Sequence, residues 1–197
     1  MEAVHIVQGT AIPIDRSDVD TDQIIPSDWL KRVERTGFDK GLFSEWRDDP
    51  NFVMNQEQYA GASVLLGGPN FGTGSSREHA VWAIQQAGFR AVISPRFGPI
   101  FKNNSTKNGL VTVEVEADLS DRLMAAVVED PSLEFTIDVE RRTLEVPALD
   151  IEVSFELSDS VQHRFLNGLD DIGLTMQLGD SIGDFEASRP GFKPTTA

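Results

Sequence analysis

Residues 62–94 read ASVLLGGPNFGTGSSREHAVWAIQQAGFRAVIS, and this stretch decides the fold class. The apolar run at 62–66 is typical of a strand that is buried on both faces. Small and apolar residues then recur at helical spacing: Ala80, Ala83, Ile84 and Ala87. Gly88 is placed to end this helix, and the apolar run at 91–94 predicts the next strand. A strand, a glycine-rich loop, a helix and a second strand in this order indicate a βαβ unit, which is normally parallel and right-handed.

The segments on either side of this unit extend the α/β pattern. An opening strand is expected at 4–14, broken by Gly9 and Pro13. The charged, turn-rich segment 15–50 is too long for an ordinary connection, and such loops are often functional. After the unit we expect a loop or short helix at 96–109, a strand at 110–115, a helix at 119–130 capped by Ser120, two or three strands within 133–155, and helices at 158–168 and 170–190. The chain is expected to form one domain, residues 1–197, with 189–197 as a flexible tail.

The charge balance excludes some classes of partner. Acidic residues outnumber basic ones, 32 against 17, which gives a formal net charge of −15. Nucleic acids and anionic membranes need a basic surface, so neither is an expected partner. A small anionic ligand needs only a few local cations or backbone N–H groups and stays compatible with the sequence.

The chain contains no cysteine. It therefore cannot form a disulfide, a thiolate nucleophile, a Cys-ligated zinc site or a cysteine-ligated iron–sulfur cluster by itself. The first ten residues carry neither a basic region nor an apolar core typical of a secretory signal. No run approaches the roughly 18 apolar residues of a membrane span, so a cytoplasmic location is expected.

The glycine-rich loop resembles three known motifs without matching any of them. Arg77 stands where a dinucleotide fingerprint needs its third glycine, Gly72-Thr73 offers no P-loop lysine, and Ser75-Ser76 lacks the following glycine of a hydrolase elbow. Two interpretations remain open. Ser75 and Glu78 have capping-box spacing, so Ser75 is expected to cap the helix. The same loop also suits a carboxylate, because glycines, a helix N-terminus and Arg77 meet at the carboxyl end of a buried strand. There the positive end of the helix would stabilise a Ser75 alkoxide able to take a proton from carbon.

Two other groups of residues are candidate metal ligands. Asp18, Asp20 and Asp22 have the spacing of a calcium loop, but Gln23 and Trp29 replace the required Gly and Glu, so a hydrogen-bonded turn is expected instead. The three histidines have no mutual metal spacing, and His79 is expected to be a packing or supporting residue. No metal site is predicted on this chain.

Several blocks together resemble one family. They are DVDTDQIIP (18–26), LKRVERTGF (30–38), FGTGSSREHAVWAI (71–84), RFGPIFKNNSTKNGL (96–110) and NGLDDIGLTMQ (167–177). In this order they resemble the small subunit of 3-isopropylmalate dehydratase, in the aconitase superfamily, from about residue 4 to about residue 190. The resemblance implies a three-layer swivelling β/β/α domain, like the C-terminal domain of aconitase. It also implies a large-subunit partner that carries a [4Fe–4S] cluster, with no cofactor on this chain.

The resemblance also implies an activity and roles for individual residues. The activity is a hydro-lyase step of leucine biosynthesis, in which 2-isopropylmalate and 3-isopropylmalate interconvert through isopropylmaleate, with the cluster iron as Lewis acid. Ser75 matches the serine that removes and returns the carbon-bound proton. Gly74, Ser76 and Arg77 match groups that hold the base and the carboxylates of a small dicarboxylate. A segment that discriminates the variable group of the substrate matches these residues: Trp29, Leu30, Lys31, Arg32, Val33 and Thr36. Thr73 stands where many relatives carry Cys, a departure that affects none of these roles.

Two alternatives remain at this point. The chain could be the small subunit of a related hydro-lyase, a homoaconitase or a citraconate hydratase, because segment 29–36 contains both apolar and basic residues. It could also be a non-catalytic assembly module in which Ser75 serves only as a helix cap.

Overall fold

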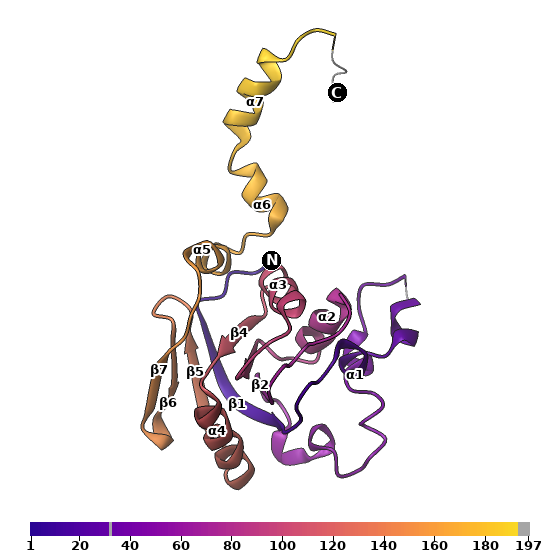
Figure 1. The fold of residues 1–197 in the computed structure, drawn as a ribbon, viewed down its shortest axis with the longest axis vertical. Helices are drawn as coiled ribbons and strands as arrows, with labels where there is room; N and C mark the ends of the chain where they lie inside the picture. The colour runs from indigo at the N-terminus through magenta and orange to yellow at the C-terminus, as the bar shows by residue number, and fades with distance from the viewer. Residues whose placement is uncertain (32, 193–197) are drawn as a thin grey trace.

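A seven-stranded mixed sheet forms the centre of the computed structural model, which describes residues 1–31 and 33–192 (Figure 1). The strand order is β4-β3-β2-β1-β5-β6-β7. The strands are β1 (Ile6–Ile14), β2 (Val64–Gly67), β3 (Ala91–Ser94), β4 (Val111–Glu114), β5 (Glu134–Asp138), β6 (Thr143–Val146) and β7 (Ile151–Ser154). The pairs from β1 to β4 are parallel, and those from β1 through β5 to β7 are antiparallel. The predicted α/β class is therefore confirmed.

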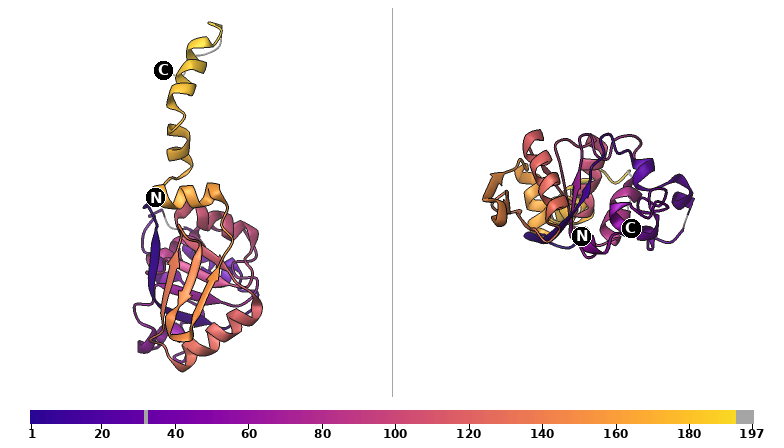
Figure 2. Two further views of the ribbon diagram at one scale, coloured as in Figure 1. Left: turned by 90° about the vertical axis from the view of Figure 1, so that its left-hand side faces the viewer. Right: turned by 90° about the horizontal axis from the view of Figure 1, so that it is seen from below.

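Helices lie around this sheet, and the last two of them extend away from it (Figures 1 and 2). They are α1 (Thr21–Ile24), α2 (Glu78–Gln86), α3 (Pro99–Asn108), α4 (Ala117–Glu129), α5 (Asp159–Asn167), α6 (Asp171–Met176) and α7 (Gly179–Ser188). Short 3₁₀ helices occur at Ser27–Lys31, Phe38–Gly41, Val53–Asn55, Glu57–Tyr59 and Pro147–Leu149. Helices α2 and α3 pack against each other, whereas α4 lies against β1 and β2.

The βαβ unit that the sequence predicts is present as β2, α2 and β3. All four residues of each strand are buried, as expected for a strand covered on both faces. Helix α2 turns Ala80, Val81, Ala83 and Ile84 into the core, and Gly88 follows its end with φ +104°. The small alanines allow the helix to lie close to the sheet, so this unit forms the rigid base of the loop between β2 and α2.

Two local expectations were wrong. Strand β1 runs unbroken through Gly9 and Pro13, because both residues stay in register with neighbouring strands, opposite Phe135 and Leu66. An added Cβ at Gly9 would lie 2.4 Å from the Ser63 hydroxyl oxygen. Ser120 does not cap α4, because this helix begins at Ala117 and Ser120 lies buried inside it. The loop or short helix expected at 96–109 is α3, a ten-residue helix that Gly109 ends at φ +86°.

The long segment after β1 is built on aromatic contacts. Phe43 stacks on Trp46 with ring centroids 5.0 Å apart, and Phe52 meets both rings edge to face. Arg16 lies over the Trp46 ring, with its guanidinium carbon 4.1 Å from the ring centroid. These contacts hold the segment against the sheet.

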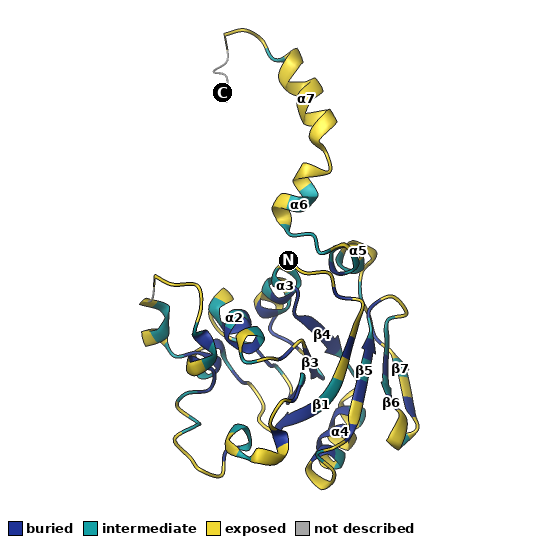
Figure 3. Cartoon of the chain, turned by 180° about the vertical axis from the view of Figure 1, so that it is seen from behind, coloured by how far each residue is buried: buried dark blue, intermediate teal, exposed yellow. Residues whose placement is uncertain are grey.

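The C-terminal helices α5, α6 and α7 follow the order that the sequence predicts. Helix α5 stays on the body through Phe165, whereas α6 and α7 extend away from it (Figures 1 and 3). The tail expected at 189–197 lies partly outside the described residues, at 193–197. The single-domain organisation of residues 1–197 and the swivelling motion stay predictions.

Candidate active site

The candidate site lies where two neighbouring parallel strands end. Strands β1 and β2 are paired from Ala11–Val64 to Ile14–Gly67, so their carboxyl ends meet at one edge of the sheet. The segments that follow them run side by side. Backbone hydrogen bonds join them from Gly72 N to Val19 O (2.7 Å), from Thr21 N to Thr73 O (2.9 Å) and from Asp18 N to Pro69 O (2.8 Å). This edge is where open α/β sheets usually bind ligands.

Gly72 and Gly74 have different surroundings in the structure. An added Cβ at Gly72 would lie 2.2 Å from the Phe101 ring, and the residue has φ +73°. Gly72 therefore allows close packing against α3. Gly74 is exposed and has φ +91°, with only Asp20 and Thr21 near its missing side chain. It turns the chain directly before Ser75, and its proposed role toward a ligand stays a prediction.

The capping box expected at Ser75 and Glu78 does not form. Helix α2 begins at Glu78, its N-cap position is Arg77, and no side chain caps it. Glu78 instead accepts a hydrogen bond from Nδ2 of Asn108 at 2.8 Å, which ties α2 to α3. The Ser75 hydroxyl is thus left for another use, and the start of the helix keeps N–H groups that favour an anion.

Thr21 holds Ser75 in place. Its Oγ1 donates to the backbone oxygen of Ser75 at 2.9 Å and lies 3.4 Å from the Ser75 hydroxyl. With its proton used in the first contact, the threonine oxygen can only accept from the serine O–H. Thr21 is 2% exposed, whereas Ser75 and Ser76 are exposed, so a buried threonine supports a serine that faces outward.

Arg77 is oriented from the same side. Its Nη1 forms an ion pair with Asp22 and donates to the backbone oxygen of Ile25 at 3.2 Å. The Arg77 side chain is only 15% exposed, and Asp22 is 56% exposed. A fixed guanidinium beside an uncapped helix start is an arrangement suited to a carboxylate.

The three aspartates after β1 have separate structural roles. Asp20 accepts from Gln23 N at 2.9 Å, and the Gln23 side chain accepts from Asp20 N at 3.0 Å, so a capping box starts α1 here. Asp18 accepts from Asn70 at 2.7 Å, and Asp22 pairs with Arg77. In residues 1–31 and 33–192, no group of three His, Cys, Asp or Glu is placed to hold a metal ion. The aspartates are hydrogen-bonded within the chain, as expected, but the segment forms the start of the short helix α1 and not a turn.

His79 is a packing residue, as the sequence suggests. Its ring lies 5.2 Å from Phe38, edge to face, and 4.7 Å from Trp82. Burial between these rings lowers the pKa of His79 from its usual value, and Arg77 lowers it further, whereas Glu78 opposes the shift. Phe38 follows the segment 29–36, so His79 connects that segment to the start of α2.

The predicted specificity residues do not share one environment. Trp29 covers Gly41, where an added Cβ would lie 2.6 Å from its ring, and Leu30 packs against the core. Lys31 is paired with Asp28 at 2.9 Å. Val33 is 93% exposed, Thr36 is also exposed, and Arg32 lies outside the described residues. The structure therefore does not bring Leu30 and Val33 together into one apolar surface.

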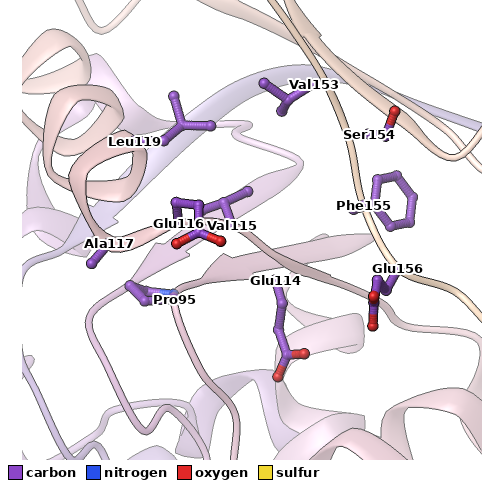
Figure 4. A pocket seen from close by; sticks show the side chains of 10 residues that line it. All are labelled: Pro95, Glu114, Val115, Glu116, Ala117, Leu119, Val153, Ser154, Phe155 and Glu156. Atoms are coloured by element: carbon purple, nitrogen blue, oxygen red, sulfur yellow. The ribbon is translucent and has the colours of Figure 1, made fainter.

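A cleft of about 690 Å³ lies elsewhere, between β4, the start of α4 and β7 (Figure 4). Its lining includes Glu114, Glu116 and Glu156, and Figure 4 shows no cationic side chain among the ten lining residues. Glu114 is paired with Lys102 at 2.6 Å, but Glu116 and Glu156 add negative charge that disfavours a dicarboxylate ligand. The cleft is therefore a poorer carboxylate site than the loop around Arg77.

Comparisons with known proteins identify the class first. Residues 1–118, which contain the whole candidate site, match the aconitase C-terminal domain family. Residues 171–197 match a second family, described as the C-terminal domain of the small subunit of 3-isopropylmalate dehydratase.

Full-length relatives then narrow this class. The 3-isopropylmalate dehydratase small subunit of Parafrankia sp. is 59% identical over all of both chains, and that of Rubrobacter xylanophilus is 56% identical over 98% of each. The crystal structure of a 3-isopropylmalate dehydratase from Methanocaldococcus jannaschii shares the fold, with a TM-score of 0.68 and 24% identity, over 91% of this chain and 99% of that one. The chain belongs to the family of 3-isopropylmalate dehydratase small subunits.

Sequence reasoning missed Thr21 and Asp22 as neighbours of the site. They precede Ser75 by more than fifty residues, and the spacing of Asp18, Asp20 and Asp22 resembles a calcium loop, which does not point to Ser75. The available signal was topological, because each segment follows a strand of a parallel sheet and carboxyl ends of such strands meet at one edge.

Proposed function

We propose that the chain is the small subunit of isopropylmalate isomerase, a hydro-lyase that interconverts 2-isopropylmalate and 3-isopropylmalate through isopropylmaleate. The observation that carries the proposal is an exposed Ser75, held by Thr21 beside Arg77 and an uncapped helix start. The family to which the chain belongs supports the reaction, since relatives at 53–59% identity are named 3-isopropylmalate dehydratase small subunits.

Arg77 binds a substrate carboxylate in this proposal. Both of its contacts within the chain, to Asp22 and to Ile25, use Nη1, so they fix the plane of the guanidinium. The edge formed by Nε and Nη2 then meets a carboxylate as a two-pronged donor. Ser76 and the backbone amide of Gly74 contribute further contacts to the substrate or to the base.

Ser75 moves the proton. Its hydroxyl must first give its own proton to water, because serine is ordinarily a very weak acid and takes a proton from carbon only as its alkoxide. The positive helix end, the neighbouring guanidinium and the loop amides stabilise the resulting alkoxide in a site closed by the partner. The same atom returns the proton to the neighbouring carbon of the alkene when water is added back.

The partner is a large subunit that carries the [4Fe–4S] cluster. This chain has no cysteine, and its described residues offer no alternative set of metal ligands. The cluster therefore does not fit on this chain, which contributes the proton transfer and carboxylate binding. When bound to the partner, the cluster supplies a Lewis acid for the departing hydroxyl.

Isopropylmalate is proposed as the substrate, ahead of a tricarboxylate, because of the family. Relatives that match the whole length of the chain at 59% and 56% identity are named 3-isopropylmalate dehydratase small subunits. Within segment 29–36, the exposed Lys31 is paired with Asp28. The hypothesis of a cap-only assembly module loses its basis, because Ser75 does not cap α2.

Reconstitution tests the proposal. The chain is mixed with the cluster-loaded large subunit of the same organism, and turnover is measured on isopropylmalate, on a homocitrate-type tricarboxylate and on citraconate. We expect isopropylmalate to give the highest kcat/KM. A higher value for the tricarboxylate or for citraconate would assign the chain to one of the related hydro-lyases, and no turnover on any of the three would overturn the proposal.

A further inference from the structure

Helices α6 and α7 form an arm, residues 171–188, that projects from the body (Figures 1 and 3). Its base is tied to the body by Asp171, whose carboxylate pairs with Arg164 at 2.7 Å and with Lys107 at 3.5 Å. These cations lower the pKa of Asp171. Beyond this base neither helix contains a buried residue.

The arm nevertheless has an apolar side. Five large hydrophobic side chains are exposed on it: Ile172 (73%), Met176 (71%), Leu178 (59%), Ile182 (38%) and Phe185 (65%). The first two are four positions apart on α6. The last three are Leu178, the N-cap residue of α7, and two residues within α7, spaced by four and three positions. This spacing places each group on one helical face, which is the pattern of a helix that lies in an apolar groove.

An isolated arm of this kind has little reason to be stable. Helices shorter than about 12 residues are marginal in water unless an apolar face is packed. A contiguous exposed apolar face on a helix marks a contact with another molecule. We therefore expect another molecule to cover the apolar face of the arm.

Charge decides which molecule covers the arm. Beyond Asp171, which is already paired with the body, residues 172–188 contain three acidic residues and no basic one: Asp180, Asp184 and Glu186. The whole chain carries a net charge of −15, so a second copy would meet the arm with like charge. The complementary occupant is a different protein with an apolar groove rimmed by Lys and Arg.

The arm lies at the N-terminal ends of the parallel strands, and the candidate site lies at their C-terminal ends. Gly168, just before the arm, lies against the N-terminal residues that lead into β1, and Lys107 lies at the end of α3, before β4. Ser75 follows the other ends of these strands. Contacts made by the arm are thus separate in space from the candidate site at Ser75.

We propose that the arm docks into a basic-rimmed apolar groove of the large subunit and supplies affinity for it without taking part in turnover. This inference rests on the proposed function, because it takes the large subunit as the partner. It assigns to residues 171–188 the role of an assembly anchor, distinct from the face that carries Ser75.

A titration with a charge-inserting variant tests the anchor. The full-length chain and the double variant Ile182→Asp/Phe185→Asp are each titrated against a fixed amount of cluster-loaded large subunit, with isomerase activity and sedimentation as readouts. Ala187→Asp, on the opposite face of α7, is the control for an aspartate placed in the same helix away from the apolar side chains. We expect the double variant to need at least tenfold more small subunit for half-maximal assembly, with turnover at saturation within twofold of the parent, and the control to behave like the parent.

Unchanged half-saturation in the double variant would overturn the proposal, as would lowered turnover at saturating concentration. Sedimentation of the free chain as a dimer that the double variant disrupts would assign the arm to a second copy and overturn it as well. If the parent lacks isomerase activity altogether, the proposed function fails, and the sedimentation readout still decides whether the arm binds the large subunit.

Discussion

Ser75 owes its position to a residue far away in the chain. The buried hydroxyl of Thr21 contacts both its backbone oxygen and its side chain, while Asp22, one residue further on, pairs with Arg77. Helix α1 thus orients the two groups that are proposed to act on substrate. The capping box of Asp20 and Gln23 fixes the start of that helix. A local helix cap after β1 thus supports a site that also uses the loop after β2.

Arg77→Lys tests the carboxylate contact at the residue scale. Lysine keeps the charge but loses the planar fork, so one charge-assisted hydrogen bond is lost. Such a bond contributes about 1.5–3 kcal/mol, so kcat/KM of the assembled enzyme is expected to fall roughly 10- to 100-fold, mainly through KM. Arg90→Lys, at an exposed arginine paired with Glu2, is the matched control and should leave both constants unchanged. Equal constants for Arg77→Lys and the parent would remove Arg77 from the substrate site.

At the scale of elements, the loop between β2 and α2 depends on close packing against α3. Phe71 and Phe101 lie edge to face with ring centroids 5.5 Å apart, and Gly72 lets the backbone pass over Phe101. At Gly98, an added Cβ would lie 2.4 Å from the Gly72 oxygen. The loop geometry is therefore set by contacts among three elements.

Comparing Gly72→Ala with Gly61→Ala separates the free-energy cost of a positive φ from the cost of overpacking against Phe101. Both glycines have positive φ, +73° and +81°, but a Cβ meets Phe101 at the first and nothing within 4 Å at the second. The left-handed conformation should cost about 1–2 kcal/mol at either position. Overpacking against Phe101 should add roughly 1–3 kcal/mol at Gly72 only. Urea unfolding measures both, and equal losses would show that the Phe101 contact contributes nothing.

The elements also show what sequence patterns can predict. The hydrophobic periodicity and the positions of the glycines predicted β2, α2 and β3, because buried strands and amphipathic helices leave local patterns in the sequence. The capping box at Ser75 was mispredicted because the spacing of two residues is necessary but not sufficient. The helix begins three residues later, where Asn108 of α3 engages Glu78. Thr21 was missed because its contact with Ser75 depends on strand pairing.

At the scale of the whole molecule, the chain carries two separate surfaces. One edge of the parallel strands presents Ser75 and Arg77, and the other carries the apolar arm of α6 and α7. The charged cleft between β4 and β7 belongs to neither of them. This arrangement suits a protein that is anchored at one place and acts at another. Among the described residues, no helix is long and apolar enough to cross a membrane.

The central claim is that Ser75 carries the proton in the assembled enzyme. Turnover of isopropylmalate by the complex containing Ser75→Ala measures this most directly. We predict that kcat falls about 10²- to 10⁴-fold in this variant, because general-base catalysis is lost, while assembly with the large subunit is unchanged. Near-normal turnover by the assembled Ser75→Ala complex would contradict the account.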